Sequence, residues 1–368
     1  MPAAPRIRTA VSAALLATLL VGCAGAAPQP TAEPSASGPL MPLAELELLD
    51  DPKSWVGEAT AVLRDTSITP VTDAPAQSLP ATVTSHDLAG DVKVTVTDTS
   101  RILGLNLAGS ISATIAGLGF GDNLVGRDSS STFPGVADLP VVTTGGHTIN
   151  SESVIALRPT LIITDGTIGP IDVMLQLREV GIPIVFVDAG AGFDGVYELA
   201  GQVSRAVGAD EAGRLLADRL RTEIEAKVAE VAAITPSAPG DRLRMLFLYL
   251  RGDSGIYYLF GAESGVDDLI TAVGGIDVAT EIGWAGMKPM TDEAIIAAAP
   301  DLILVMSSGL ESAGGVDGLL QTKAAIGITP AGQSRRFVTM ADGEILSFGP
   351  RTADVIDAVA RAVYAPQG

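Results

Sequence analysis

One long helical pattern in the middle of the chain constrains the fold more than any other feature of the sequence. Apolar residues recur near helical spacing over residues 194–234, and short β-rich runs alternate with helical stretches on both sides of this segment. Gly208 and Gly213 are the weak points at which the pattern can break into two helices. A repeated βα rhythm predicts parallel sheets with helices on both faces. We therefore predict an α/β protein with two lobes joined by one long helical element.

The expected elements follow from apolar runs, period-2 alternation, helix caps and Gly or Pro breaks. In the first half we expect strands at 92–96, 101–107, 123–126, 141–142, 161–164 and 184–187, and helices at 110–118, 151–157 (capped by Ser151) and 171–180. In the second half we expect strands at 243–249, 302–305 and 336–340, and helices at 265–273, 292–298, 318–324 and 351–363.

The N-terminus predicts export. Arg6 and Arg8 precede an apolar stretch at residues 10–21, which is too short to span a bilayer comfortably and is typical of a signal peptide. The stretch ends in LVGC (residues 20–23), which resembles the bacterial lipobox, in which the cysteine becomes the lipidated first residue of the mature protein. Cys23 is the only cysteine, so an intrachain disulfide is impossible. We expect a lipid anchor at Cys23 and a location outside the cytoplasm.

The predicted domain organisation places a tether after the anchor. Residues 24–38 are rich in Ala, Pro, Ser and Gln and cannot bury enough apolar surface to fold. Residues 42–80 contain Trp55 and one amphipathic patch. Their structure is left unassigned, and packing along the surface of the folded body is one alternative. The full division is a signal peptide at 1–22, the lipidated cysteine with tether and extension at 23–81, an N-terminal lobe at 82–191, a connecting helix at 192–236 and a C-terminal lobe at 237–368.

Charge and motifs argue against nucleic-acid binding and catalysis. The chain has 23 Lys and Arg against 43 Asp and Glu, for a net charge of -20, which repels a phosphate backbone. It has no nucleophile elbow, C-x-x-C, H-E-x-x-H or phosphate-binding loop with a following Lys. His147 near Ser151 raises a hydrolase alternative, but a strained nucleophile turn is missing. We expect a monomeric binding protein without enzymatic activity.

Two segments of the chain echo each other. Residues 150–163 and 291–304 both read as a polar cap, a Glu, an apolar helix, a Pro and an apolar strand, with seven residues from Glu152 to Pro159 and from Glu293 to Pro300. A purely structural explanation exists, because a Glu at a helix start favours the helix dipole and a Pro ends a helix.

This layout resembles the class III periplasmic binding proteins, which serve importers of siderophores, vitamin B12 and haem. The resemblance covers residue 82 to the C-terminus and implies two Rossmann-like α/β lobes joined by a long backbone helix. It also implies that Glu152 and Glu293 dock into arginine pockets on a membrane permease dimer, and exposed carboxylates on two rigid lobes would set the orientation of a docked partner.

Three residues suggest the ligand chemistry. His147 follows an apolar strand, where loops of an α/β lobe face the binding crevice. Tyr249 and Arg251 are two apart in a predicted strand, so their side chains should share one side. An arginine stabilises a phenolate, and tyrosine is an established haem ligand. An ordinary loop histidine and a core tyrosine are the alternatives.

These residues, with the segments 97–101, 119–128 and 348–352, resemble the haem-binding lipoproteins of actinobacterial haem uptake systems. The resemblance implies that His147 and Tyr249 are the axial ligands of a transported haem iron and that Arg251 hydrogen-bonds the tyrosine oxygen. It leaves open whether the cargo is instead a ferric siderophore or cobalamin, and whether the protein captures haem at the surface without a permease.

Other residues are weaker candidates for the haem pocket. Trp284 could stack on a porphyrin edge, and Met306, with Met287 or Met290 as alternatives, could pack on the ring, although methionine is most often a core filler. Arg351 could meet a propionate, and a structural role at a helix start is equally open to it. One of Tyr257 and Tyr258 could face the crevice, whereas His86 is expected on the surface.

Overall fold

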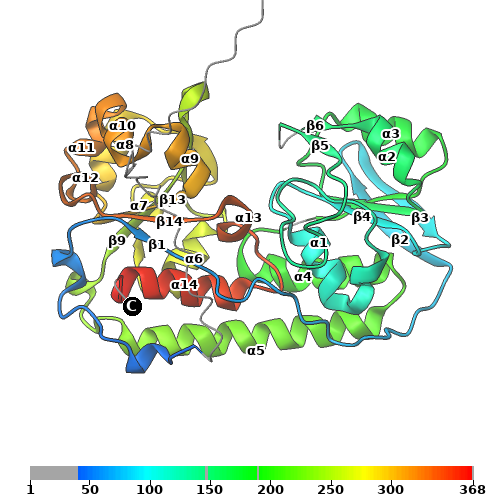
Figure 1. Ribbon diagram of the computed structural model, residues 1–368, viewed down its shortest axis with the longest axis horizontal. Coiled ribbons are helices and arrows are strands. Elements are labelled where there is room, and N and C mark those ends of the chain that lie inside the picture. Colours follow the sequence, from blue (N-terminus) through cyan, green and yellow to red (C-terminus); the bar gives the residue numbers. More distant parts are fainter. Residues whose placement is uncertain (1–39, 146–147, 189, 367–368) are drawn as a thin grey trace, which may run out of the picture. The chain divides into compact units, whose positions relative to one another are not determined.

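The computed structural model of the protein describes residues 40–145, 148–188 and 190–366 (Figure 1). The described residues from Met41 onward belong to one compact unit. Within it, one sheet belongs to an N-terminal lobe and a second sheet to a C-terminal lobe, and two long helices follow each other between them along the chain (Figure 1). The α/β class and the two-lobe, long-helix layout predicted from the sequence are confirmed.

The N-terminal lobe contains a parallel sheet of order β4-β7-β8. Its strands are β4 (Ile102–Leu105), β7 (Leu161–Thr164) and β8 (Ile184–Phe186), and every residue in them is buried. A sheet that is covered by helices on both faces requires such continuous apolar runs rather than alternating ones. Its helices are α1 (Ser110–Ile115), α2 (Ser151–Leu157) and α3 (Ile171–Glu179), with a π-turn at Ala116–Phe120 and a 3-10 turn at Gly121–Asn123 after α1.

Two expected strands of this lobe are wrong, and β2 (Ala81–Asp87), β5 (Thr143–Thr144) and β6 (Thr148–Ile149) escaped prediction. Residues 123–126 and 141–142 form only single bridges, Leu124 to Ile102 and Val141 to Arg127, and the short hairpin of β5 and β6 comes later. The predicted strand at 92–96 is part of β3 (Gly90–Val96), which pairs antiparallel with β2. The sequence of β2 is rich in Thr and Ser and lacks a clear apolar run, which explains why it was missed.

The C-terminal lobe has a mixed sheet of order β1-β14-β13-β9-β10-β12, with β11 also paired to β9. The prediction of a wholly parallel sheet is wrong here, because β10 and β12 run antiparallel to their neighbours. The connection after β9 is the 3-10 turn Gly252–Ser254 followed by Gly255 at φ 65, and so short a connection can only make a hairpin. The strands are β1 (Ala59–Thr60), β9 (Arg244–Arg251), β10 (Ile256–Phe260), β11 (Ile276–Asp277), β12 (Met287–Pro289), β13 (Leu302–Met306) and β14 (Phe337–Met340).

Helices surround this second sheet. They are α6 (Val266–Ala272), α7 (Val278–Glu281), α8 (Asp292–Ala298), α9 (Ser307–Ser312), α10 (Gly315–Thr322), α11 (Ala324–Gly327), α12 (Pro330–Ser334), α13 (Asp342–Ile345) and α14 (Thr352–Tyr364), with a 3-10 turn at Pro239–Asp241 before β9. The helix expected at 292–298 is confirmed at both ends, because Thr291 caps it and Pro300 follows it closely.

The helical segment between the lobes consists of α4 (Gly192–Ala206) and α5 (Asp210–Ile234), with α14 packed along α5 (Figure 1). The break falls at Gly208, whose φ of 68 favours glycine. Gly213, the other predicted weak point, lies inside α5, where a Cβ would come within 1.9 Å of the Ser204 hydroxyl oxygen. Its lack of a side chain lets the two helices pack closely.

The extension before the first lobe is part of the folded unit. It carries the 3-10 turns Leu43–Glu45 and Pro52–Ser54, and β1 pairs parallel with β14. On the C-terminal lobe, the Leu49 N–H donates to the Tyr364 carbonyl at 2.9 Å. On the N-terminal lobe, the N–H of Val71 donates to the Gly117 carbonyl at 2.8 Å. Residues 41–80 therefore form a strap that contacts both lobes, which the sequence left unassigned.

None of the helices in the described ranges is long and apolar enough to cross a membrane.

Candidate functional site

Tyr249 and Arg251 lie on the same side of β9, as the strand period predicted. The guanidinium carbon of Arg251 lies 4.7 Å from the centre of the Tyr249 ring. Both side chains are half-buried, whereas Leu248 and Leu250 between and beside them are buried in the opposite core. The arginine thus contacts the face of the tyrosine ring, and no hydrogen bond joins it to the phenol oxygen among the described residues.

Asp342 is a partner of Arg251 that sequence reasoning missed. Its carboxylate accepts a 3.0 Å hydrogen bond from Arg251 Nη2 and a 3.1 Å bond from the Ser308 N–H, and the Ser308 hydroxyl also contacts it. Asp342 opens α13 after β14, and Ser308 lies in α9 directly after β13. The order of the strands indicates that these residues lie near one another. Each follows or ends one of the parallel strands β9, β13 and β14, whose carboxyl ends meet at one edge of the sheet.

Aromatic rings surround Tyr249 on its face of the sheet. Tyr258 stands directly opposite it in the β9–β10 register, so both side chains share a face. The Phe260 ring centre lies 6.2 Å from that of Tyr249 and 5.1 Å from that of Phe247. Tyr257 faces the other way and is buried, with Lys323 Nζ 4.3 Å from its ring centre. Of the two neighbouring tyrosines, Tyr258 is therefore the one beside Tyr249.

The weaker candidates occupy different surroundings. Trp284 is partly buried, and its indole N–H donates to the Leu259 carbonyl at 3.1 Å. Met306 ends β13 and is buried in the main core. Arg351 is only 3% exposed, and its Nη2 donates to the Gly343 carbonyl at 3.2 Å. Burial lowers the pKa of Arg351 despite the nearby carboxylate of Glu344. The contacts of all three with a ligand stay predictions.

Two predicted residues, His147 and Cys23, lie outside the described residues. The strands β5 and β6 flank residues 145–147 and pair antiparallel, with Thr143 opposite Ile149. His86, the second histidine, lies on β2, is exposed as predicted, and has its Nδ1 3.0 Å from Asp91.

Glu152 and Glu293 occupy equivalent exposed positions in the first turns of α2 and α8. The cap of α2 is Asn150 rather than the predicted Ser151, because the Asn150 side chain accepts the Ser153 N–H at 3.0 Å. Both residues are exposed, and their docking on a partner stays a prediction.

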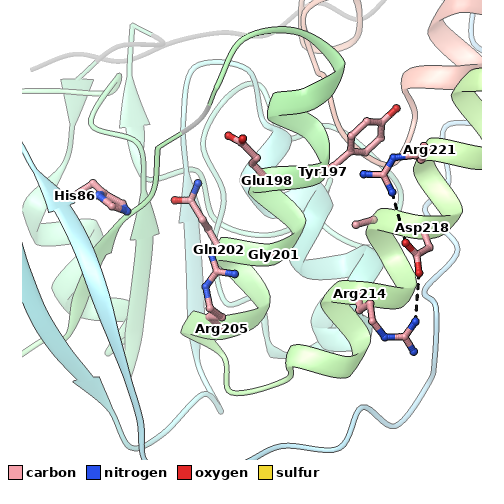
Figure 2. A pocket seen from close by; sticks show the side chains of 10 residues that line it. His86, Tyr197, Glu198, Gly201, Gln202, Arg205, Arg214, Asp218 and Arg221 are labelled. Carbon is pink, nitrogen blue, oxygen red and sulfur yellow. Dashed lines mark hydrogen bonds and ion pairs between the residues drawn. The ribbon is translucent and has the colours of Figure 1, made fainter.

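A cavity of about 480 Å³ lies elsewhere in the molecule and includes none of the predicted ligand residues (Figure 2). It is lined by side chains of β2, α4 and α5, among them His86, Tyr197 and Arg221. Two of its arginines are partly neutralised, because Asp218 lies 3.3 Å from Arg214 and 3.5 Å from Arg221. We assign it no role in ligand binding.

Within the ranges that the structure describes, no group of three or more His, Cys, Asp or Glu side chains could hold a bare metal ion. The phenol, arginine and aromatic rings around Tyr249 suit a planar organic ligand better than a free ion.

Comparison with known proteins decides the family. A family model described as periplasmic binding protein matches residues 106–342, which is more than half of the chain. The chain belongs to this family. Its members are binding components of transporters, so the expectation of a binding protein rather than an enzyme holds for the family as a whole.

Several solved structures resemble this family member closely. The haem binding protein HmuT is 39% identical, with a TM-score of 0.78, over 86% of this chain and 99% of its own. Solved HmuT variants replace a histidine, a tyrosine and an arginine by alanine, and the tyrosine and arginine are separated by one residue. The periplasmic haem-binding protein RhuT from Roseiflexus sp. RS-1 is 35% identical, with a TM-score of 0.65, over 73% of this chain and 98% of its own.

A sequence relative adds the transport context. An uncharacterized ABC transporter substrate-binding lipoprotein of Bacillus subtilis (strain 168), YvrC, is 24% identical over 254 residues, which span 67% of this chain and 75% of YvrC.

Proposed function

We propose that this chain is the haem-binding component of an ABC haem importer. The observation that carries the proposal is the 39% identity to HmuT, a haem binding protein, over 86% of this chain. The Tyr249–Arg251 pair supports it, because the same residue types at the same spacing are those replaced in the HmuT variants.

In this proposal, His147 and Tyr249 ligate the haem iron from opposite sides, and Arg251 stabilises the phenolate. A phenolate is an anionic oxygen donor suited to ferric iron. Tyr258 and Phe260 would extend an apolar wall beside the porphyrin, and Trp284, Met306 and Arg351 remain predicted pocket residues. Asp342 would hold the Arg251 guanidinium in place when the site is empty.

Delivery requires a membrane location and a partner. We propose that residues 1–22 are removed, that Cys23 carries the lipid and that residues near the anchor tether the folded unit. The relation to a substrate-binding lipoprotein supports the anchor. Glu152 and Glu293 would dock on the permease dimer, and transfer would occur when docking pulls the lobes apart and weakens both axial bonds. Charge reversal at both glutamates that left haem uptake intact would contradict this step.

A visible spectrum tests the ligand. Ferric haem is titrated into the mature chain and into His147→Ala and Tyr249→Ala, with His86→Ala as the matched histidine control. We expect a Soret band that saturates at one equivalent, with altered bands in the two site variants and an unchanged band in the control. Absence of a stoichiometric band would reject haem as the cargo and make ferric siderophores and cobalamin the next ligands to titrate.

A further inference from the structure

The helices α2 and α8 match position by position and not only in sequence. Val154 and Ile295 occupy equivalent positions and are fully buried. Each helix ends in a left-handed residue immediately before a proline, Arg158 at φ 46 in α2 and Ala299 at φ 42 in α8. Left-handed geometry is uncommon outside glycine, so its recurrence at both ends shows that the two helices terminate in the same way.

An arginine anchors each helix to the strand beside it. Arg101, just before β4, donates through Nη2 to the Leu157 carbonyl at 2.6 Å. Arg244, the first residue of β9, donates through Nη2 to the Ala298 carbonyl at 3.0 Å. Leu157 and Ala298 are equivalent positions, five residues after the two glutamates. The orientation of each helix relative to its sheet is therefore fixed by the same contact, and the exposed faces of the two helices are alike.

An isoleucine is exposed on each of these faces. Ile155 is 51% exposed and Ile296 is 45% exposed. They lie three residues after Glu152 and Glu293, and residues three apart are neighbours on a helix surface. Each lobe thus presents one carboxylate with one large apolar side chain beside it. In Figure 1 both helices lie on the side of their lobe away from α5.

We propose that these two Glu–Ile pairs are one repeated docking contact for a two-fold symmetric permease dimer, in which each Ile enters an apolar depression beside a basic residue of the permease. The inference rests on the proposed transport function and adds an apolar contact to the charged one. The two Glu–Ile patches have the same residue types in the same local structure. A two-fold symmetric dimer presents two identical binding surfaces, one for each patch. A net charge of -20 favours a partner whose receiving surface is basic.

A second copy of this chain is a poorer occupant of the same faces. Its docking would bring carboxylates of Glu152 and Glu293 against one another, and like charges at an interface oppose association. The experiment below includes this outcome.

The test measures the Kd of the mature chain, made with Cys23→Ser to remove the lipid anchor, for the haem permease dimer of the same organism in nanodiscs. The variants are Ile155→Ser, Ile296→Ser and the double. Controls are Leu88→Ser, in the turn between β2 and β3, and Val62→Ser, in the strap, at positions that are 79% and 63% exposed. We expect each site variant to weaken binding roughly tenfold and the double roughly a hundredfold, with unchanged haem spectra and controls within about twofold of wild type.

Three results would overturn the inference. If the Ile variants bind like wild type while Glu152→Gln with Glu293→Gln loses binding, the apolar contact is wrong and charged docking stands. If wild type binds haem but not the permease, the transport role fails and the docking contact fails with it. If sedimentation shows a dimer of the chain that the Ile variants dissociate, the occupant is a second copy.

Discussion

At the scale of single residues, Arg251 stands between two groups that both favour its positive charge. It lies over the Tyr249 ring at 4.7 Å and pairs with Asp342 at 3.0 Å. The ring contact orients the guanidinium by a cation–π interaction, and the carboxylate balances its charge. The Arg251 guanidinium is therefore already held in position beside any anionic oxygen ligand on this face.

We expect Tyr249→Ala to weaken haem binding more than His147→Ala, by a further factor of roughly ten. The tyrosine change removes an anionic ligand and the aromatic face on which Arg251 rests, whereas the histidine change removes a neutral donor. Haem titration followed at the Soret band gives both affinities, with Tyr258→Phe as a control that keeps the neighbouring ring. Negligible losses from both alanine variants would reject the axial assignment.

At the scale of elements, the crossing of α4 and α5 depends on one glycine. A Cβ at Gly213 would lie 1.9 Å from Ser204 Oγ and 2.4 Å from Ser204 Cβ. Glycine normally weakens a helix, so its presence inside α5 is explained by close approach rather than by propensity. By contrast, a Cβ at Gly201 in α4 would meet only the flexible end of Arg205 at 3.3 Å.

The two glycines should consequently respond in opposite ways to alanine. We expect Gly213→Ala to lower the free energy of unfolding by about 2 kcal/mol, because α4 and α5 must separate. We expect Gly201→Ala to raise it by about 0.5 kcal/mol through helix propensity. Urea denaturation measures both. A Gly213→Ala variant as stable as wild type would show that the two helices can shift without cost.

At the scale of the whole molecule, the strap of residues 41–80 is part of the fold although it precedes the first lobe. Leu43 is 2% exposed, in a turn that packs on α5. Trp55 lies over the buried Arg336 guanidinium, with 5.6 Å from the guanidinium carbon to the ring centre. Gln77 donates to the Val207 carbonyl and to the Thr99 hydroxyl, each at 2.8 Å.

We expect Leu43→Ala to destabilise the protein by about 3 kcal/mol, the cost of removing a buried leucine side chain. Met41→Ala is the matched control, because Met41 is exposed and should change the stability little. Thermal or urea unfolding measures both variants. Equal stabilities would mean that the strap contributes no packing energy.

A fall in pH should also lower the stability of the whole molecule through Asp357, whose side chain joins α14 to α5. Burial by itself would raise the pKa of Asp357, but hydrogen bonds from Arg361 and Lys227 outweigh it and hold the pKa below its ordinary value. A carboxyl with a lowered folded-state pKa stabilises the fold above its unfolded pKa of about 4 and loses this contribution as the pH falls through the folded value.

We therefore expect Asp357→Asn to lower the free energy of unfolding by about 2 kcal/mol at pH 7. The difference from wild type should shrink as the pH falls below about 4. Asp218→Asn, at an exposed position of α5, should have little effect at either pH. Denaturation curves across this range check the sign. A difference that persisted unchanged in acid would contradict the ionic contribution of Asp357.

Local signals in the sequence determined much of the fold. The apolar run of β7, the cap and proline around α8 and the glycine at the break between α4 and α5 each act within a few residues of the chain. The common side of Tyr249 and Arg251 likewise follows from the period of a strand. The positions of Glu152 and Glu293 in the first turns of two helices could also be predicted, because local cap residues mark the start of each helix.

Only the tertiary structure decided the features that depend on distant pairing. The pairing of β10 with β12 and of β1 with β14 joins residues far apart in the chain, and their own segments carry no signal for the partner. For Arg251, the order of the parallel strands indicates the edge of the sheet but not that Asp342 is the partner. The same holds for the strap and for the packing of Gly213 on Ser204. Sequence alone thus determined most of the elements and the lobed layout, because these are set by local period and caps. Three-dimensional packing determined which neighbours those residues have, because a side chain's partners are chosen by the whole fold.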